Sequence, residues 1–345
     1  MSDEHISHKQ GRVTISDVAR VAKTGKTSVS RYLNGEYHLL SDGLKKRIES
    51  AIRTLDYSPS QMARSLKGGQ TRLIALIIAD ITNPYSVGIL CGIEAACRLN
   101  GFMLLMCNTN NEIAQEQYYL QLLSNYRVEG IIVNATGIRE EELLCLQQSR
   151  LPMVLIDRKI PDFHCDVVGL DNIQAAILTT SHLIEQGFEA ILFLSEPLEL
   201  VNTRQERLLG FLQTMQQYNN RVAENKEIRL SDQQQIDEVL HSFYQRHRGM
   251  RKAVLSANGA LTLQIARSMR RLNLRWGSDI GLLGFDELDW AELAGVGITT
   301  LRQPTYQIGY TATERLLRRI QGDTQQFCDD CLHGELIPRL STINN

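Results

Sequence analysis

Apolar residues near the start of the chain recur at intervals of three and four, the spacing that places side chains on one face of a helix. The pattern predicts three short helices, over residues 14–22, 26–34 and 41–55. Thr14 or Ser16 can cap the first helix, and Asn34 with Gly35 ends the second, because both residues tolerate a left-handed backbone. Two short helices joined by a tight turn and braced by a third form a helix-turn-helix, although a small helical protein-binding bundle has the same pattern.

From Leu73 onward, short apolar runs alternate with amphipathic helices, which is typical of parallel sheets covered by helices on both faces. The predicted strands lie within residues 73–79, 102–108, 130–134, 153–157, 190–195, 253–257 and 280–284. The predicted helices between them include 84–99, 114–126 and 173–186. Since about 270 residues are available, we expect two α/β lobes behind a small all-α domain.

The connector between the two parts has its own helix signals. Ser58 is a good N-cap, Pro59 suits the first helical position, and Gly68-Gly69 stops the helix. A helix of about nine residues is too short to be stable alone in water. We therefore expect it to form only against a partner; the alternative is an ordinary interdomain linker.

Charge is unevenly distributed along the chain. Residues 1–72 contain 13 Lys and Arg against 7 Asp and Glu, whereas the remaining residues contain 24 against 32. The basic residues 1–72, which we call the head, precede an acidic remainder, which we call the body, and this predicts an anionic partner for the head. The alternative is a chance excess of positive charge on a solvated surface. No apolar run is long enough for a transmembrane helix, and the start lacks the apolar core of a signal peptide, so we expect a cytoplasmic protein with no membrane partner.

The sequence contains none of the catalytic or metal-binding motifs that we searched for. The seven cysteines lie mostly in apolar runs and are expected to be reduced thiols, and the single C-x-x-C of Cys328 and Cys331 has no second pair or histidine set for a metal. No phosphate loop and no G-x-S-x-G motif is present, so we expect no cofactor and no enzyme. Two classes remain: a ligand-controlled DNA-binding repressor, or a cytosolic sugar-binding or sugar-modifying α/β protein whose helical head docks another protein. A salt-dependent gel shift on palindromic duplexes separates them.

The stretch TISDVARVA…TSVSRYLNG resembles the start of the LacI/GalR family of bacterial transcription regulators, and the similarity continues from Thr14 to about Leu340. The resemblance implies that the second helix reads the major groove and that the connector is a hinge helix whose leucine wedges into the minor groove. The DNA-binding residues expected on this basis are Thr14, Lys26, Thr27, Ser28, Ser30, Arg31, Asn34, Tyr57, Ser60, Ala63, Arg64 and Leu66. The turn departs from the family pattern, because Lys23 and Gly25 stand where a glycine and a serine are usual, and Ser60 replaces the usual asparagine.

The same resemblance implies a domain plan and a fold. The body would be a two-lobed periplasmic-binding-protein-like domain that binds an effector and dimerises. The expected parts are a disordered tail over 1–12, the helix-turn-helix over 13–57, the hinge helix and linker over 58–72, lobe 1 over about 73–169 and 303–333, and lobe 2 over about 170–302 and 334–340. A dimer is expected because one recognition helix reads too few base pairs, and its two-fold symmetry predicts a pseudo-palindromic operator.

Polar residues follow several of the predicted strands. They are Asp80, Asn108, Asn134, Asp157, Asn258 and Asp286. In open α/β sheets ligands bind outside the carboxyl ends of the strands, so these side chains are expected to converge on a cleft between the lobes. The alternative for each one is a helix N-cap.

The resemblance adds residues and a ligand class to this cleft. The effector-binding residues expected are Asn83, Tyr85, Asn134, Asp157, Arg158, Arg207, Asn258, Asp286 and Trp290. Gly259 and Glu287 each stand where the family usually has an aspartate. The glycine removes one acid, which makes the pocket less negative and favours a ligand with its own negative charge. GFDELDWAEL resembles the gluconate-like branch, so we expect a sugar or sugar acid such as gluconate, with Trp290 either stacking on it or serving as a lid or core residue.

Overall fold

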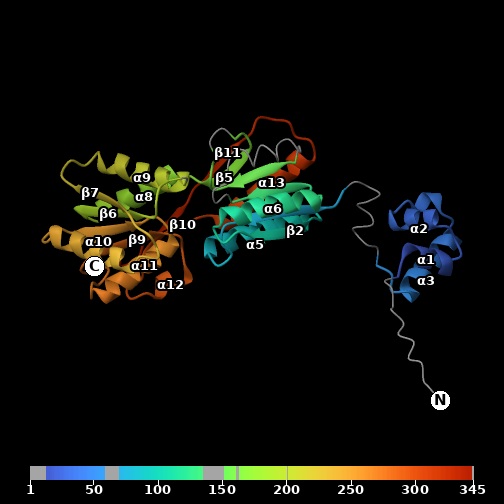
Figure 1. Ribbon diagram of the computed structural model, residues 1–345, viewed down its shortest axis with the longest axis horizontal. Helices are drawn as coiled ribbons and strands as arrows, with labels where there is room; N and C mark the ends of the chain where they lie inside the picture. Colours follow the sequence, from blue (N-terminus) through green and yellow to red (C-terminus); the bar gives the residue numbers. More distant parts are fainter. Residues whose placement is uncertain (1–12, 59–69, 135–150, 161–162, 200, 344–345) are drawn as a thin grey trace, which may run out of the picture. The chain divides into compact units, whose positions relative to one another are not determined.

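The computed structural model describes residues 13–58, 70–134, 151–160, 163–199 and 201–343. The chain forms two compact units, Met1–Thr71 and Arg72–Asn345 (Figure 1). The predicted tail over residues 1–12 and most of the predicted hinge helix lie outside the described residues. The same holds for four of the expected DNA-binding residues, Ser60, Ala63, Arg64 and Leu66.

The first unit contains a three-helix head. Helices α1, α2 and α3 span Ile15–Val21, Lys26–Leu33 and Asp42–Thr54, close to the predicted ranges, and a short 3-10 helix, η1 (Tyr37–Leu39), was not predicted. Val18, Val29 and Ile48, one from each α-helix, are fully buried where the helices meet. The apolar stripes read from the sequence therefore form one small core.

The ends of the head helices follow their local chemistry. The carboxylate of Asp17 accepts hydrogen bonds from the backbone N–H of Thr14 at 3.0 Å and from its hydroxyl at 2.7 Å. These bonds, with a smaller contribution from Arg20, lower the pKa of Asp17 to about 2. Gly25 caps α2, and Lys23 in the turn has φ 51°, a left-handed conformation that costs a residue with a Cβ roughly 1–2 kcal/mol.

The second unit contains two six-stranded sheets, one in each lobe (Figure 1). The first sheet has the order β11-β5-β4-β3-β1-β2 and the second the order β12-β10-β9-β8-β6-β7. The strands of the first sheet are β1 (Leu73–Ile78), β2 (Met103–Asn108), β3 (Gly130–Val133), β4 (Met153–Ile156), β5 (Asp166–Leu170) and β11 (Asp329–Leu332). Those of the second are β6 (Ala190–Ser195), β7 (Val222–Glu227), β8 (Lys252–Ser256), β9 (Gly281–Phe285), β10 (Thr299–Arg302) and β12 (Glu335–Ile337).

Most neighbouring strands are parallel, as predicted. In the first sheet Leu76 of β1 lies opposite Met106 of β2 and Ile132 of β3. The short edge strand β12 is the exception, because it pairs antiparallel with β10. The chain passes between the sheets after β5, after β10 and between β11 and β12, so three segments join the two lobes.

Helices cover both faces of each sheet. The first lobe has α5 (Pro84–Leu99), α6 (Ile113–Asn125) and α13 (Thr305–Ile320), and the second has α8 (Asn172–Glu185), α9 (Asn202–Met215), α10 (Gln233–Arg246), α11 (Gly259–Arg271) and α12 (Asp289–Leu293). Each sheet carries one apolar cluster per face. The buried strands that make these clusters place their carboxyl ends at the boundary between the lobes.

Helices α5 and α13 approach each other unusually closely. A Cβ on Gly92 would overlap the backbone carbonyl of Tyr306, and a Cβ on Gly309 would overlap the carbonyl of Ile89. The contact therefore needs glycine for space rather than for an unusual φ. Both helices start at the boundary between the lobes, at Pro84 and Thr305.

Candidate functional site

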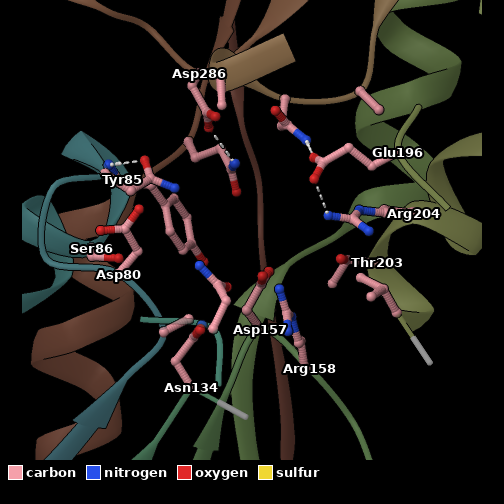
Figure 2. Close-up of a pocket in the computed structure, with 18 of the residues that line it drawn as sticks. Asp80, Tyr85, Ser86, Asn134, Asp157, Arg158, Glu196, Thr203, Arg204 and Asp286 are labelled. Atoms are coloured by element: carbon pink, nitrogen blue, oxygen red, sulfur yellow. Dashed lines mark hydrogen bonds and ion pairs between the residues drawn. The ribbon is translucent and has the colours of Figure 1, made fainter. Parts of the chain in front are cut away.

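A cavity of about 180 Å³ lies between the two lobes (Figure 2). It is smaller than the roughly 300–1,000 Å³ of typical ligand pockets, so it suits a small molecule. Tyr85 and Asp80 line one side, and Glu196 and Arg204 line the other. Of the six polar residues that follow predicted strands, five line the cavity: Asp80, Asn134, Asp157, Asn258 and Asp286.

Three buried polar atoms in the cavity wall make no hydrogen bond of normal geometry to the described residues. They are the Tyr85 hydroxyl, Asp157 Oδ1 and Gln303 Oε1, and the Tyr85 hydroxyl and the Asp157 carboxyl interact with each other electrostatically. Burial and then the neighbouring charge of Asp157 raise the pKa of Tyr85 well above its usual value, so the phenol stays protonated. Burial also raises the pKa of Asp157, against the opposing charges of Arg207 and Arg158. An unpaired buried polar atom costs about 1–3 kcal/mol, so these atoms point to a ligand that would pair with them.

Asp286 is held in place by two neighbours. Its Oδ2 accepts the backbone N–H of Gly259 at 2.8 Å, and its Oδ1 accepts from Gln303 Nε2 at 2.6 Å. A Cβ on Gly259 would lie 3.1 Å from the Asp286 carboxylate, so the glycine lets the acid approach the start of α11. Asp286 also has φ 74°, which turns the chain sharply after β9.

The Arg207 side chain reaches the cavity from α9, and three neighbouring groups hold its guanidinium in place. Its Nε donates to Asn172 Oδ1 at 2.8 Å and its Nη1 to the carbonyl of Ala257 at 2.5 Å. The guanidinium lies 4.3 Å from the centre of the Phe285 ring, and the residue is 5% exposed. Both hydrogen-bond partners are neutral, so the positive charge of Arg207 is available to an anionic group in the cavity.

The second lobe contributes a linked group that the sequence did not identify as a unit. Glu196 Oε1 pairs with Arg204 at 3.0 Å, and its Oε2 accepts from Asn258 Nδ2 at 2.6 Å. Thr203 also lines the cavity. Glu196 follows β6 directly, so its place at a strand end was a usable signal. Gln303 follows β10, a strand that the sequence did not predict, and Thr203 follows no strand.

Other expected effector residues also line the cavity, and some combine two roles. Asn83 caps α5 by accepting the N–H of Tyr85, and Asn258 caps α11 by accepting the N–H of Leu261. The N-cap alternative and the binding interpretation are therefore compatible. Asn134 and Arg158 complete the set in the first lobe.

Two residues expected in the cleft lie elsewhere. Trp290 of α12 is not in the cavity wall; it packs against the apolar cluster of the second sheet, as in the core alternative. Asn108 accepts the N–H of Ile81 and donates to Asn110 beside the cavity. Glu287, which stands where the family usually has a second aspartate, pairs with Arg339 instead of lining the cavity.

The head presents part of the expected DNA-binding set to solvent. Lys26, Thr27 and Arg31 of α2 are exposed, as is Asn34 at its C-terminal end. Ser28 and Ser30 of the same helix are half-buried. Tyr57 packs against the head core, and the Thr14 side chain is engaged at the start of α1. The exposed group contains cations and hydrogen-bonding side chains that suit phosphates and base edges.

Within the described part of the chain, no cluster of histidine, cysteine or acidic side chains is suited to hold a metal ion. Cys328 and Cys331 are free thiols. Nor is any helix there long and apolar enough to cross a membrane.

Residues 14–60 match the model of bacterial regulatory proteins of the lacI family, and residues 71–331 match that of periplasmic binding proteins and the sugar binding domain of the LacI family. The chain belongs to the LacI family. It is 44% identical to the HTH-type transcriptional regulator PtxS of Pseudomonas aeruginosa over an alignment of 333 residues, and this alignment covers 96% of each protein. It is 38% identical to the HTH-type transcriptional regulator KdgR of Bacillus subtilis over an alignment of 314 residues, and this alignment covers 91% of this chain and 93% of the relative.

The solved structures agree on the fold. The lac repressor dimer bound to operator and the anti-inducer ONPF superposes with a TM-score of 0.83 at 22% identity, covering 97% of this chain and 100% of that one. This confirms the predicted helix-turn-helix and two-lobed α/β architecture. The LacI-family chain is a DNA-binding transcriptional regulator, and its close relatives are regulators rather than enzymes, which decides between the two classes that the sequence left open.

Proposed function

We propose that this regulator is a homodimeric repressor whose effector is a small polyhydroxylated carboxylate, a sugar acid of the gluconate type. The observation that carries the ligand class is the set of three unpaired buried polar atoms beside Arg207. Asp157 Oδ1 and Gln303 Oε1 accept hydrogen bonds, whereas the protonated Tyr85 hydroxyl donates one. A ligand that satisfies all three has at least two hydroxyl donors and one oxygen acceptor.

The arginines support a negative charge on the same ligand. Arg204 is neutralised by Glu196, but Arg207 has only neutral hydrogen-bond partners in its surroundings. A carboxylate accepts well from the planar guanidinium fork, and the Phe285 ring keeps that fork oriented. A neutral sugar would offer this guanidinium no carboxylate.

The proposed response is a shift in population between lobe arrangements. An effector that contacts Tyr85 and Asp157 in one lobe and Arg207 in the other favours the arrangement in which both sides reach it. The helices α5 and α13 start at the cavity, so their lobe moves with the ligand. We propose that this movement separates the two hinge segments of the dimer and releases a pseudo-palindromic operator.

A thermal-shift screen tests the ligand class. It compares D-gluconate and related sugar acids with neutral sugars of equal size and with simple carboxylates that lack hydroxyls. We expect only the sugar acids to raise the unfolding temperature, because a ligand that binds the folded state stabilises it by mass action. A neutral sugar that binds as tightly as its acid would refute the role of Arg207.

A gel shift on palindromic duplexes then tests the response. The protein should bind such a duplex with strong salt dependence, and the ligand identified in the screen should release it. Binding that the ligand leaves unchanged would refute the coupling while leaving the assignment as a DNA-binding regulator intact.

A further inference from the structure

A backbone hydrogen bond joins the two lobes beside the cavity. The loop after β4 brings Asp157 and Arg158 into the cavity wall, and the next residue, Lys159, donates its backbone N–H to Asn202 Oδ1 at 3.1 Å. Asn202 is the first residue of α9 in the second lobe. The first-lobe loop is thus bonded directly to the helix that carries Arg207.

Glu206 extends this contact into the cavity wall. Its Oε1 accepts from Asn202 Nδ2 at 3.2 Å, and its Oε2 accepts from Asn172 Nδ2 at 3.0 Å. Asn172 is 3% exposed, and its side-chain oxygen Oδ1 accepts a hydrogen bond from Arg207 Nε. A continuous series of hydrogen bonds therefore runs from the Lys159 backbone through Glu206 to the guanidinium that faces the cavity.

The Lys159 side chain lies between acids of both lobes. Its Nζ pairs with Asp329 of β11 at 2.5 Å. Burial by itself lowers the pKa of Lys159, but Asp329 and then the charge of Glu206 outweigh this and raise it. The ammonium therefore links the edge of the first sheet electrostatically to the same glutamate that orders the second-lobe side.

We propose that Asn202 and Glu206 are positioning residues that hold the two lobes at the separation at which Asp157 and Arg207 reach one ligand. Asn202 supplies the bond between the lobes, and Glu206 holds both Asn202 and the Asn172 amide that orients Arg207. The identity of that ligand rests on the function proposed above, whereas the effect on lobe separation does not. Removing the Asn202 side chain deletes the oxygen that accepts the Lys159 N–H.

The main experiment measures the distance between the lobes in the full-length protein without ligand or DNA. A ketone-bearing amino acid replaces Tyr118 of α6 and Gln233 of α10, which are both exposed. Each ketone then carries one spin label, so the native cysteines need not be labelled. Labelled chains are diluted into an excess of unlabelled chains, so that each distance lies within one chain. Asn202→Ala should shift and broaden the distance distribution towards longer separations.

Two controls separate the proposed contact from its surroundings. Gln205→Ala changes an exposed neighbour on the same turn, which donates to the Leu198 carbonyl, and should leave the distribution as in the wild type. Lys159→Ala keeps the backbone N–H while deleting the pair with Asp329, and should shift it less than Asn202→Ala. An unchanged distribution in Asn202→Ala, or an equal shift in Lys159→Ala, would overturn the proposal.

Ligand binding gives a second, independent measure. With D-gluconate as the probe, Asn202→Ala should raise the dissociation constant by about 5- to 10-fold, the loss of roughly one hydrogen bond. Glu206→Gln, which keeps the shape of the side chain but removes its charge, serves as a milder variant if Asn202→Ala fails to fold, and it should shift the label distance in the same direction. If D-gluconate does not bind the wild type, the ligand class is refuted, while the label distances still decide the role of Asn202.

Discussion

Replacing Tyr85 with phenylalanine should change stability and effector binding in opposite directions. The Tyr85 hydroxyl is buried in the cavity wall, and its contact with Asp157 lacks the geometry of a normal hydrogen bond. Leaving such a group unsatisfied costs the folded state about 1–3 kcal/mol, so deleting it should stabilise the ligand-free protein by roughly 1 kcal/mol or more. For a domain of this size that corresponds to a rise of about 2–4 °C in unfolding temperature.

The same deletion should weaken effector binding, because the bound ligand loses its partner. A hydrogen bond from a buried hydroxyl to a carboxylate or hydroxyl oxygen contributes about 1–3 kcal/mol, which predicts a dissociation constant roughly 5- to 150-fold higher. Unfolding in denaturant gives the first quantity, and isothermal titration with the effector found in the screen gives the second.

Tyr306→Phe is a matched control for this pair of measurements. Tyr306 is 50% exposed and stacks on Tyr310, so its hydroxyl reaches water and its loss should change neither quantity appreciably. If Tyr85→Phe instead destabilised the ligand-free protein by more than 1 kcal/mol, the hydroxyl would have to be satisfied by Asp157. In that case the unpaired atoms would no longer support a polyhydroxylated ligand.

Four further outcomes follow from the same description. Arg207→Lys should keep a charge but lose the fork that binds Asn172, and titration should show weaker effector binding while the gel shift shows normal operator affinity. Because burial raises the pKa of Asp157, its ionised fraction grows as the pH rises through that raised value; effector affinity should therefore increase with pH, and Asp157→Asn should abolish that dependence in titrations at several pH values. Lys23→Gly should stabilise the head by about 1 kcal/mol in thermal unfolding, since glycine adopts φ 51° without strain. Leu66→Ala should weaken operator binding in the gel shift and leave effector binding unchanged, and equal operator affinity would contradict the minor-groove wedge.

Most of the buried strands were predictable because a strand covered on both faces is apolar along its whole length. The strands β1 and β6 are of this kind and lie within the predicted runs, and β9 extends one residue beyond its run. The strands β5 and β10 are also mostly buried but were missed, because DVVGL and TTLR contain polar residues. The strand β7 has the sequence VAENKE and is mostly exposed at the edge of its sheet, so nothing in its polarity separates it from a loop. The strands β11 and β12 were missed for the same reason.

The site was predictable where a side chain follows its strand directly. Asp157 and Asp286 follow β4 and β9, and the parallel sheets bring those strand ends together. Gln303 reaches the cavity because the chain crosses between lobes there, which depends on tertiary structure. Trp290 shows the converse, since a tryptophan four residues after Asp286 suggested a stacking platform, but the short helix α12 turns it into the apolar cluster.

The glycine contact between α5 and α13 has a mechanical consequence. Because the backbone of one helix touches that of the other at Gly92 and Gly309, no layer of side chains lies between them to rearrange and absorb displacement. We therefore expect the two helices to move together, so that a displacement of Tyr85 near the start of α5 is passed on to α13. An alanine at either glycine should push the helices apart and weaken this coupling.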